Sequence, residues 1–313
     1  MKFKTALKLS AIAQSTGARL LGDPDFMVTG LNEIHMVEPG DITFVDHPKY
    51  YAKVLASAAS VIIIDKEPSN TMGKNLLILD HPFEAYNNLA KTHSPFVSLN
   101  RNISESAVIG LNTVIQPGVV IGHNVRIGKD CILHPNVVIY DNCVIGDRVQ
   151  IHAGAILGSD AFYFKKQDDA YTTMHSCGRV VIGDDVTIGA ACTIDRGVSG
   201  DTTIGDGSKL DNQVHVGHDT VIGKHCLFAA QVGIAGVVKI EDHVILWGQV
   251  GVQKDLTIGK GAVVLGQSGI GKSLDAGKTY FGSPTRDAID KMRELALLKR
   301  LPEVFERLDK SEY

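Results

Sequence analysis

The sequence predicts a mainly β protein whose central part is a parallel β-helix, and three observations support this prediction. Glycine is abundant, with 32 residues in a chain of 313, whereas aromatic residues make up only 6%. An aliphatic or other large apolar residue recurs at every sixth position from Ile103 to Ile270, giving 25 hexads with two interruptions. A small or β-branched residue commonly precedes it by two positions, as Val125 and Cys131 do. Such a period is typical of a β-solenoid.

Each hexad is explained by a short strand followed by a turn, with two side chains pointing inward. Three strands make one triangular coil of about 18 residues, and coils stack about 4.8 Å apart, so the prediction is about eight coils and a prism about 40 Å long. Glycine often follows the aliphatic residue, where we expect it to supply a turn with φ > 0. By similarity to other hexapeptide-repeat proteins, the β-helix is expected to be left-handed. Four cysteines fall at inward positions: Cys131, Cys143, Cys192 and Cys226.

The flanking segments do not repeat. The first hundred residues are typical of an α/β domain, with a helix near 7–17 that turns Leu7, Ile12 and Ala13 inward, strands near 28–31, 42–45, 60–65 and 75–80, and a helix near 83–93. After Pro284 the pattern is helical, broken at Pro302, with an apolar stripe that we expect to pack within a trimer. The predicted domains are 1–98, 99–283 and 284–313.

Composition and charge exclude several classes of protein. The net charge of −4 argues against a nucleic-acid-binding protein. The sequence has no apolar run long enough for a transmembrane helix. Lys8 interrupts the first apolar stretch, so we expect no secretory signal and a cytoplasmic protein. The five cysteines form no CxxC pair, and we expect no metal and no bound cofactor.

Candidate chemistry lies where the repeat is broken: at the loop 158–179, at the slip 197–201 and at the polar stretch 212–218. His215 and His218 flank the inward Val216, so both imidazoles should project outward near a corner. His218 is the candidate general base. Gly236 lies one coil further on, where an unshielded N–H could polarise a carbonyl oxygen; alternatively, it is an ordinary turn glycine. A base and an oxyanion donor so placed favour acyl transfer.

Several stretches resemble one family. They are PGDITFVDHPKY (39–50), GSDAF (158–162), GRVVIGDDVTIGAACTIDRG (178–197), DNQVHVGHDTVIG (211–223) and QVGIAG (231–236). The chain is similar over nearly its whole length to the UDP-3-O-(3-hydroxyacyl)glucosamine N-acyltransferases of lipid A biosynthesis. The resemblance implies a homotrimer that takes a hydroxyacyl chain from acyl carrier protein, which holds it on phosphopantetheine, and transfers it to the 2-amine of the UDP-sugar lipid. It also implies that His218 is the base and Gly236 the oxyanion donor.

The resemblance implies substrate-binding residues as well. Phe44 and Tyr50 match the aromatic pair that stacks on uracil, and Phe162 is expected to line the acyl groove. His215 is expected beside the substrate. Two positions depart from the pattern: His47 stands where asparagine is usual, and Asp255 where many members have a second active-site histidine.

Three alternatives remain open. The chain could be another hexapeptide acyltransferase that uses an acyl-CoA on a sugar nucleotide, although the match at 39–50 speaks against this. It could be a non-catalytic paralogue, because of His47 and Asp255. A carbonic-anhydrase-like metal site would need a third histidine beside His215 and His218, and the sequence offers no evident one.

Overall fold

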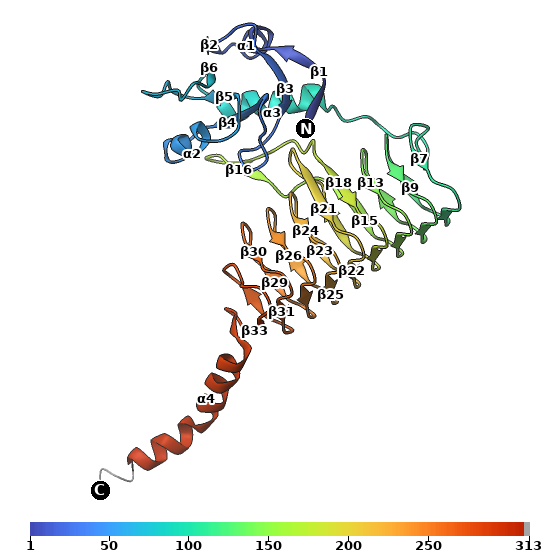
Figure 1. Cartoon of the computed structure of the whole chain (residues 1–313), viewed down its shortest axis with the longest axis vertical. Helices are drawn as coiled ribbons and strands as arrows, with labels where there is room; N and C mark the ends of the chain where they lie inside the picture. The colour runs from blue at the N-terminus through green and yellow to red at the C-terminus, as the bar shows by residue number, and fades with distance from the viewer. Residues whose placement is uncertain (310–313) are drawn as a thin grey trace.

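The computed structural model describes residues 1–309. They form an N-terminal α/β domain, a left-handed parallel β-helix and a C-terminal helix that projects away from the end of the prism (Figure 1). The α/β domain lies against the side of the prism, over its middle coils, rather than on its end (Figure 1). This placement brings the domain beside the coils that carry the candidate site.

The α/β domain is built on one six-stranded sheet in the order β1-β3-β4-β5-β6-β2, in which β3 to β6 are parallel and the two edge strands antiparallel. Its elements are β1 (Lys2–Lys8), α1 (Leu9–Thr16), β2 (Arg19–Leu21), β3 (Met27–Leu31), β4 (Asp41–Val45), η1 (Pro48–Tyr50), α2 (Tyr51–Leu55), β5 (Val61–Ile64), β6 (Asn75–Ile78) and α3 (Pro82–His93). The four predicted strands and the helix near 83–93 are confirmed.

The predicted first helix is wrong in its first part. Residues up to Lys8 form strand β1, and the helix begins only at Leu9. Leu7 therefore belongs to a strand, and the residues of α1 that face the core are Leu9, Ile12 and Ala13. The edge position explains the error, because β1 carries three lysines and shows no clean alternation.

Three parallel sheets form the faces of the prism. The first holds β7 (Val108–Ile109), β10 (Arg126–Ile127), β13 (Val144–Ile145), β18 (Arg179–Ile182), β21 (Asp201–Ile204), β24 (Val221–Ile222), β27 (Lys239–Ile240) and β30 (Thr257–Ile258). The second holds β8 (Val114–Ile115), β11 (Ile132–Leu133), β14 (Gln150–Ile151), β19 (Thr187–Ile188), β22 (Lys209–Leu210), β25 (Leu227–Phe228), β28 (Ile245–Leu246), β31 (Val263–Val264), β33 (Thr279–Phe281) and the antiparallel β34 (Arg286–Asp287). The third holds β9 (Val120–Ile121), β12 (Val138–Ile139), β15 (Ile156–Ser159), β20 (Thr193–Asp195), β23 (His215–Val216), β26 (Gly233–Ile234), β29 (Gly251–Val252) and β32 (Gly269–Ile270).

The pairing register confirms the hexad prediction. Most strands pair with the strand 18 residues on, as Val216 does with Ile234. At the first interruption Ile145 pairs with Ile182, 37 positions on, and at the slip Ile182 pairs with Ile204, 22 positions on. Both interruptions are therefore looped out of otherwise regular coils. The four inward cysteines are buried and free, as predicted.

The glycines that follow the aliphatic residues serve a different purpose from the one expected. Left-handed backbone occurs two residues later, mainly at asparagine, aspartate, glutamine and histidine, as at Asn124 and His225. A Cβ at Gly110 would lie 2.5 Å from the backbone of Gly128, in the next coil. Glycine is needed there because successive coils approach closely, and φ > 0 is met by residues that tolerate it.

The loop 158–179 folds onto the α/β domain as a hairpin of β16 (Phe164–Lys166) and β17 (Tyr171–Thr173). The buried Asn87 of α3 donates to the Thr173 carbonyl at 3.0 Å and accepts from the His175 N–H at 2.7 Å. Lys165 pairs with Asp46 at 2.5 Å. The insertion thus fastens the domain to the prism.

The C-terminal segment differs from prediction at both ends. Residues 286–287 form the short strand β34, and α4 (Ala288–Asp309) runs through Pro302 as one helix. Its apolar stripe, Ile289, Met292, Leu295, Leu298 and Leu301, is exposed. Across residues 1–309, we find no helix with the length and apolar character needed to span a membrane.

Candidate active site

A groove of about 1620 Å³ lies between the α/β domain and the third face of the β-helix. It collects residues from β4, the hairpin insertion and coils that are far apart in the sequence. Seven of the eight predicted site residues line it: Phe44, Tyr50, Phe162, His215, His218, Gly236 and Asp255. The eighth, His47, is not among them.

His218 is held by a buried carboxylate. Its Nδ1–H donates to Asp219 Oδ2 at 2.9 Å, and the same oxygen accepts the Val198 N–H at 2.9 Å. The Asp219 side chain is fully buried, and the His218 side chain is 13% exposed. Because Nδ1 carries the proton, Nε2 is left with its lone pair, which is the arrangement a general base requires.

Gly236 occupies the place of His218 in the next coil, because Val216 pairs with Ile234. At six other corners the equivalent backbone N–H donates to an aspartate or asparagine side chain one coil further on, as the Lys224 N–H does to Asp242 at 2.8 Å. The residue one coil beyond Gly236 is Lys254, which has no acceptor to offer. Within residues 1–309 the Gly236 N–H therefore finds no protein acceptor and remains available to a ligand.

Glycine at position 236 also has a steric role. A Cβ there would lie 2.5 Å from His218 Nε2 and under 3 Å from two ring carbons. The imidazole therefore packs directly against the Gly236 backbone. Its reactive nitrogen and the free N–H lie next to each other at one corner of the prism.

The two aromatic residues expected at the nucleotide base both line the groove, but they differ in surroundings. Phe44 is half-buried against Tyr86, with ring centroids 4.7 Å apart. Tyr50 is 49% exposed, and Lys49 Nζ lies 5.5 Å from its ring centroid. His47 caps η1 by accepting the Lys49 N–H at 3.2 Å on Nδ1. His47 thus serves the turn that carries Tyr50.

The remaining predicted residues lie around the candidate base. His215 Nε2 is 3.8 Å from the buried Asp195, whose pKa burial raises. Phe162 is 84% exposed at the mouth of the groove and packs edge-on against Phe164. Asp255 is exposed and lies 3.7 Å from Lys254. On the coil that follows Gly236, the chain therefore presents the carboxylate of Asp255 where the family resemblance would place a histidine.

Sequence reasoning missed the acidic residues that surround the base. Asp219, Asp195 and Glu33 are buried and lie close to the histidines. Burial, with smaller contributions from the carboxylates of Asp219 and Asp255, raises the pKa of Glu33 to about 8. Asp219 could have been found, since it follows His218 directly. Glu33 gives no comparable signal, because only the docking of the α/β domain brings it to the prism.

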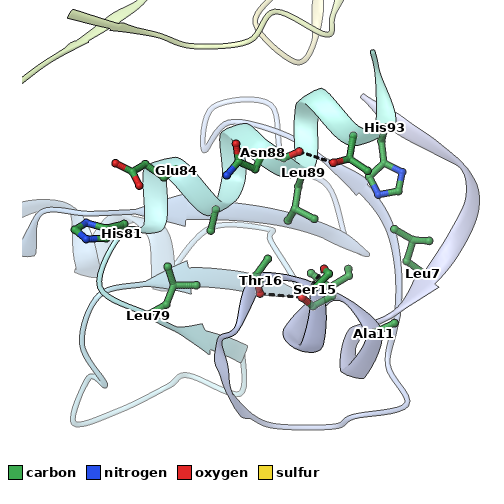
Figure 2. Close-up of a pocket in the computed structure, with 13 residues that line it drawn as sticks. Leu7, Ala11, Ser15, Thr16, Leu79, His81, Glu84, Asn88, Leu89 and His93 are labelled. Atoms are coloured by element: carbon green, nitrogen blue, oxygen red, sulfur yellow. Dashed lines mark hydrogen bonds between the residues drawn. The ribbon is translucent and has the colours of Figure 1, made fainter. Parts of the chain in front are cut away.

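A second cavity of about 480 Å³ lies on the α/β domain between α1 and α3 (Figure 2). It is lined by apolar or small side chains such as Leu7, Ala11 and Leu89, with His81, Glu84 and His93 also around it. None of the predicted site residues lies in it. The candidate chemistry is therefore confined to the larger groove.

Comparisons with known proteins agree with both parts of the fold. The family model described as UDP-3-O-(3-hydroxymyristoyl) glucosamine N-acyltransferase matches residues 25–92. The bacterial transferase hexapeptide model matches residues 106–141, 124–159 and 201–236, and the hexapeptide repeat of succinyl-transferase matches 179–217. The matches cover the α/β domain and the β-helix separately.

Relatives found by sequence are named UDP-3-O-acylglucosamine N-acyltransferase, whereas similar solved structures are UDP-N-acetylglucosamine acyltransferases. UDP-3-O-acylglucosamine N-acyltransferase of Dechloromonas aromatica is 39% identical over 237 residues, which cover 69% of this chain and 68% of that protein. The enzyme so named in Cupriavidus metallidurans is 39% identical, with 67% of each chain covered. Among solved structures, the UDP-N-acetylglucosamine acyltransferase of Francisella novicida is 29% identical with a TM-score of 0.55, over 65% of this chain and 76% of that one. The corresponding protein of Bacteroides fragilis is 26% identical with a TM-score of 0.54, over 64% and 77%.

Proposed function

Because the chain belongs to the UDP-3-O-acylglucosamine N-acyltransferase family, we propose that it transfers a 3-hydroxyacyl chain from acyl carrier protein to the 2-amine of UDP-3-O-acylglucosamine in lipid A biosynthesis. One observation carries the proposal. His218, held by the buried Asp219, presents Nε2 beside a backbone N–H of Gly236 that lacks a protein acceptor. A base and an oxyanion donor at one point are what amine acylation needs.

His218 acts as the general base in this proposal. As the glucosamine nitrogen attacks the thioester carbon, Nε2 takes the proton that the nitrogen loses. Asp219 holds the ring in the correct tautomer and stabilises the imidazolium that forms. No metal or bound cofactor takes part; the acyl donor brings its own phosphopantetheine.

Gly236 supplies the N–H that stabilises the negative oxygen of the tetrahedral intermediate. Collapse of the intermediate re-forms the carbonyl and breaks the carbon–sulfur bond, and the imidazolium of His218 then protonates the departing thiolate. Lys254, one coil above Gly236 and lining the groove, is suited to the phosphate of the pantetheine arm.

The rest of the groove suits the nucleotide and the acyl chains. Phe44 and Tyr50 belong to the α/β domain and face the same groove as His218, so we assign the uracil to them; stacking contributes about 1 kcal/mol or more for each ring face. We assign an acyl chain to Phe162 and Phe164, the exposed aromatic pair of the insertion. We assign His215 and Asp255 to the sugar part of the substrate.

We further propose a cytoplasmic homotrimer. The exposed apolar stripe of α4 has no partner within the described part of a single chain, and helix association would bury it. The basic residues of α4, Lys291, Arg293, Lys299 and Arg300, suit the acidic surface expected of a carrier protein.

The decisive experiment is a transfer assay with purified protein. UDP-3-O-acylglucosamine is incubated with a panel of 3-hydroxyacyl carrier proteins of different chain lengths, and with acyl-CoA as the competing donor, and the mass of the product is measured. We expect an N-acylated product from carrier protein alone. Transfer from acyl-CoA only would favour the second class of acyltransferase, and no transfer by wild type would favour a non-catalytic paralogue.

Two variants test the role of His218. We expect His218→Ala to lower kcat by at least about 10²-fold, and Asp219→Asn to lower it by about 10²–10⁴-fold, because the ring is left in the wrong tautomer. KM for the sugar nucleotide should change little. Asp242→Asn is the matched control, because it makes the same change at a corner away from the groove, where the asparagine amide oxygen can still accept the Lys224 N–H. Equal kcat values for wild type and His218→Ala would refute the base assignment.

A further inference from the structure

Three potential metal ligands meet behind the candidate base, where the α/β domain touches the prism. Glu33 and His35 come from the loop after β3, and Asp219 from the corner next to His218. One side-chain donor atom from each lies within 4.8 Å of the others. His35 Nε2 is 4.0 Å from Asp219 Oδ1. Two tetrahedral ligands that each lie about 2.0–2.2 Å from one ion are about 3.3–3.6 Å apart, so a bound ion would draw these two atoms slightly closer together.

Two oxygens of this cluster are buried without any partner. Glu33 Oε2 and Asp219 Oδ1 accept no hydrogen bond within residues 1–309. Glu33 is 8% exposed and Asp219 is 4% exposed. A buried carboxylate oxygen without a partner is costly unless it is neutralised or bound to a cation. Asp219 is satisfied on its other oxygen by His218 and Val198, so only Oδ1 is unaccounted for.

The slip in the repeat passes close to Asp219 Oδ1. A Cβ at Gly197 would lie 2.7 Å from this oxygen, and a Cβ at Gly200 would lie 3.4 Å from it. The slip therefore contacts both oxygens of Asp219: the Val198 N–H donates to Oδ2, and Gly197 and Gly200 lie beside the unpartnered Oδ1. The His35 side chain is 26% exposed and lines the groove with Glu33, which gives an ion a route from solvent.

We propose that Glu33, His35 and Asp219 form a binding site for a divalent transition-metal ion. Two carboxylates offset the charge of the ion, and the imidazole nitrogen favours an ion such as Zn²⁺ over Mg²⁺, which prefers oxygen ligands alone. The protein supplies three ligands and the groove leaves a further position for water. The sequence alone predicts no metal because Glu33 and Asp219 are 186 positions apart and meet only through domain docking.

The test is zinc binding by the full-length protein without a histidine tag. The protein is stripped with EDTA, returned to a non-chelating buffer and titrated with ZnCl₂ by isothermal titration calorimetry. Stacked surface histidines, such as His225 with His243, can bind zinc weakly, so the measured quantity is the difference between variants. We expect the wild-type protein to bind one more Zn²⁺ ion per chain than Glu33→Gln or His35→Gln does. Where a variant still binds this ion, we expect its affinity to be about tenfold weaker than that of wild type.

Glu38→Gln and His225→Gln are the matched controls, and both should keep the additional equivalent. Co²⁺ serves as a second probe: wild type should give a visible absorption band that both ligand variants lose. Circular dichroism melting verifies that Glu33→Gln and His35→Gln are folded. The proposal is overturned if wild type and folded ligand variants bind Zn²⁺ with the same stoichiometry and affinity, or if wild type binds none. Neither result depends on whether the protein transfers acyl chains.

Discussion

At the residue scale, Gly236 and His218 constrain each other. The N–H of Gly236 lacks a protein acceptor because Lys254 stands where an aspartate or asparagine caps equivalent corners. The imidazole of His218 fits only because position 236 has no Cβ. A glycine that resembles an ordinary turn residue is thus required for the position of the His218 ring. Its neighbour Val237 has φ of 61°, an uncommon value for a β-branched residue, which marks this corner as strained.

We predict that Gly236→Ala lowers kcat by about 10²-fold or more while the protein remains folded. The new Cβ would displace His218 Nε2, 2.5 Å away, and misplacement of a base by about 1 Å is enough for such a loss. Gly248→Ala is the control, because its Cβ would meet only the Ala230 oxygen, at 3.5 Å. Equal kcat values for the two variants would contradict the steric role.

Burial lowers the reactivity of the Cys177 thiol. It is the cysteine of the insertion rather than of the repeat, and burial raises the pKa of its thiol to about 11, from an ordinary 9.0. The thiol therefore stays protonated at pH 8.5 in the folded protein, and ionises only as the pH rises toward 11.

We predict that iodoacetamide alkylates Cys177 about 100-fold more slowly in the native protein than in the unfolded protein at pH 8.5. The reason is that a thiol with a pKa of about 11 has a far smaller thiolate fraction at this pH than one with a pKa of 9.0. Mass spectrometry of the Cys177 peptide after timed quenching measures the rate. Rapid native labelling would show an exposed, ionised thiol and would contradict the burial of Cys177.

At the element scale, the hairpin β16–β17 decides where the α/β domain lies. Its hydrogen bonds to Asn87 and its ion pair with Asp46 attach it to the domain, and its ends belong to the prism. Met174 and Val198, from the insertion and the slip, pack into the core of the α/β domain. Both interruptions of the repeat therefore build the contact that encloses the groove.

We predict that Asn87→Ala destabilises this contact by about 1–3 kcal/mol, because it removes the two hydrogen bonds that the buried Asn87 amide makes to the Thr173 carbonyl and the His175 N–H. Limited proteolysis should then cut within 158–179 faster than in wild type. The exposed Asn88→Ala, one residue along α3, is the control. Unchanged cleavage in Asn87→Ala would mean that other contacts hold the hairpin.

At the scale of the whole molecule, the groove joins segments from both ends of the chain. Phe44 and Asp255 line the same groove although 211 positions separate them. The helix α4 projects from the prism (Figure 1). Its apolar stripe is exposed. A single chain thus exposes a surface that association of copies would bury.

We predict that the double variant Leu295→Asp, Leu298→Asp weakens the proposed trimer, so that dissociation begins at a protein concentration about tenfold or more above that of wild type. Light scattering coupled to size-exclusion chromatography over a dilution series measures it. Lys299→Ser, on the same helix, should have no effect. A double variant as stable as the wild-type trimer would place the assembly contacts on the prism alone.

The sequence by itself determined the β-helix, because the residues that point inward recur at every sixth position. Val216 and Ile234, which are 18 positions apart, accordingly pair in adjacent coils. It also located His218 and Gly236, since a fixed coil length turns sequence separation into spatial proximity. It could not identify the strand β1, whose edge position leaves no alternation, or the roles of Asp219 and Glu33. Only the tertiary structure decided these, because the meeting of Glu33 and His35 with the prism depends on how two separately folded parts dock. That docking rests on a few side-chain contacts that leave no periodic trace in the sequence.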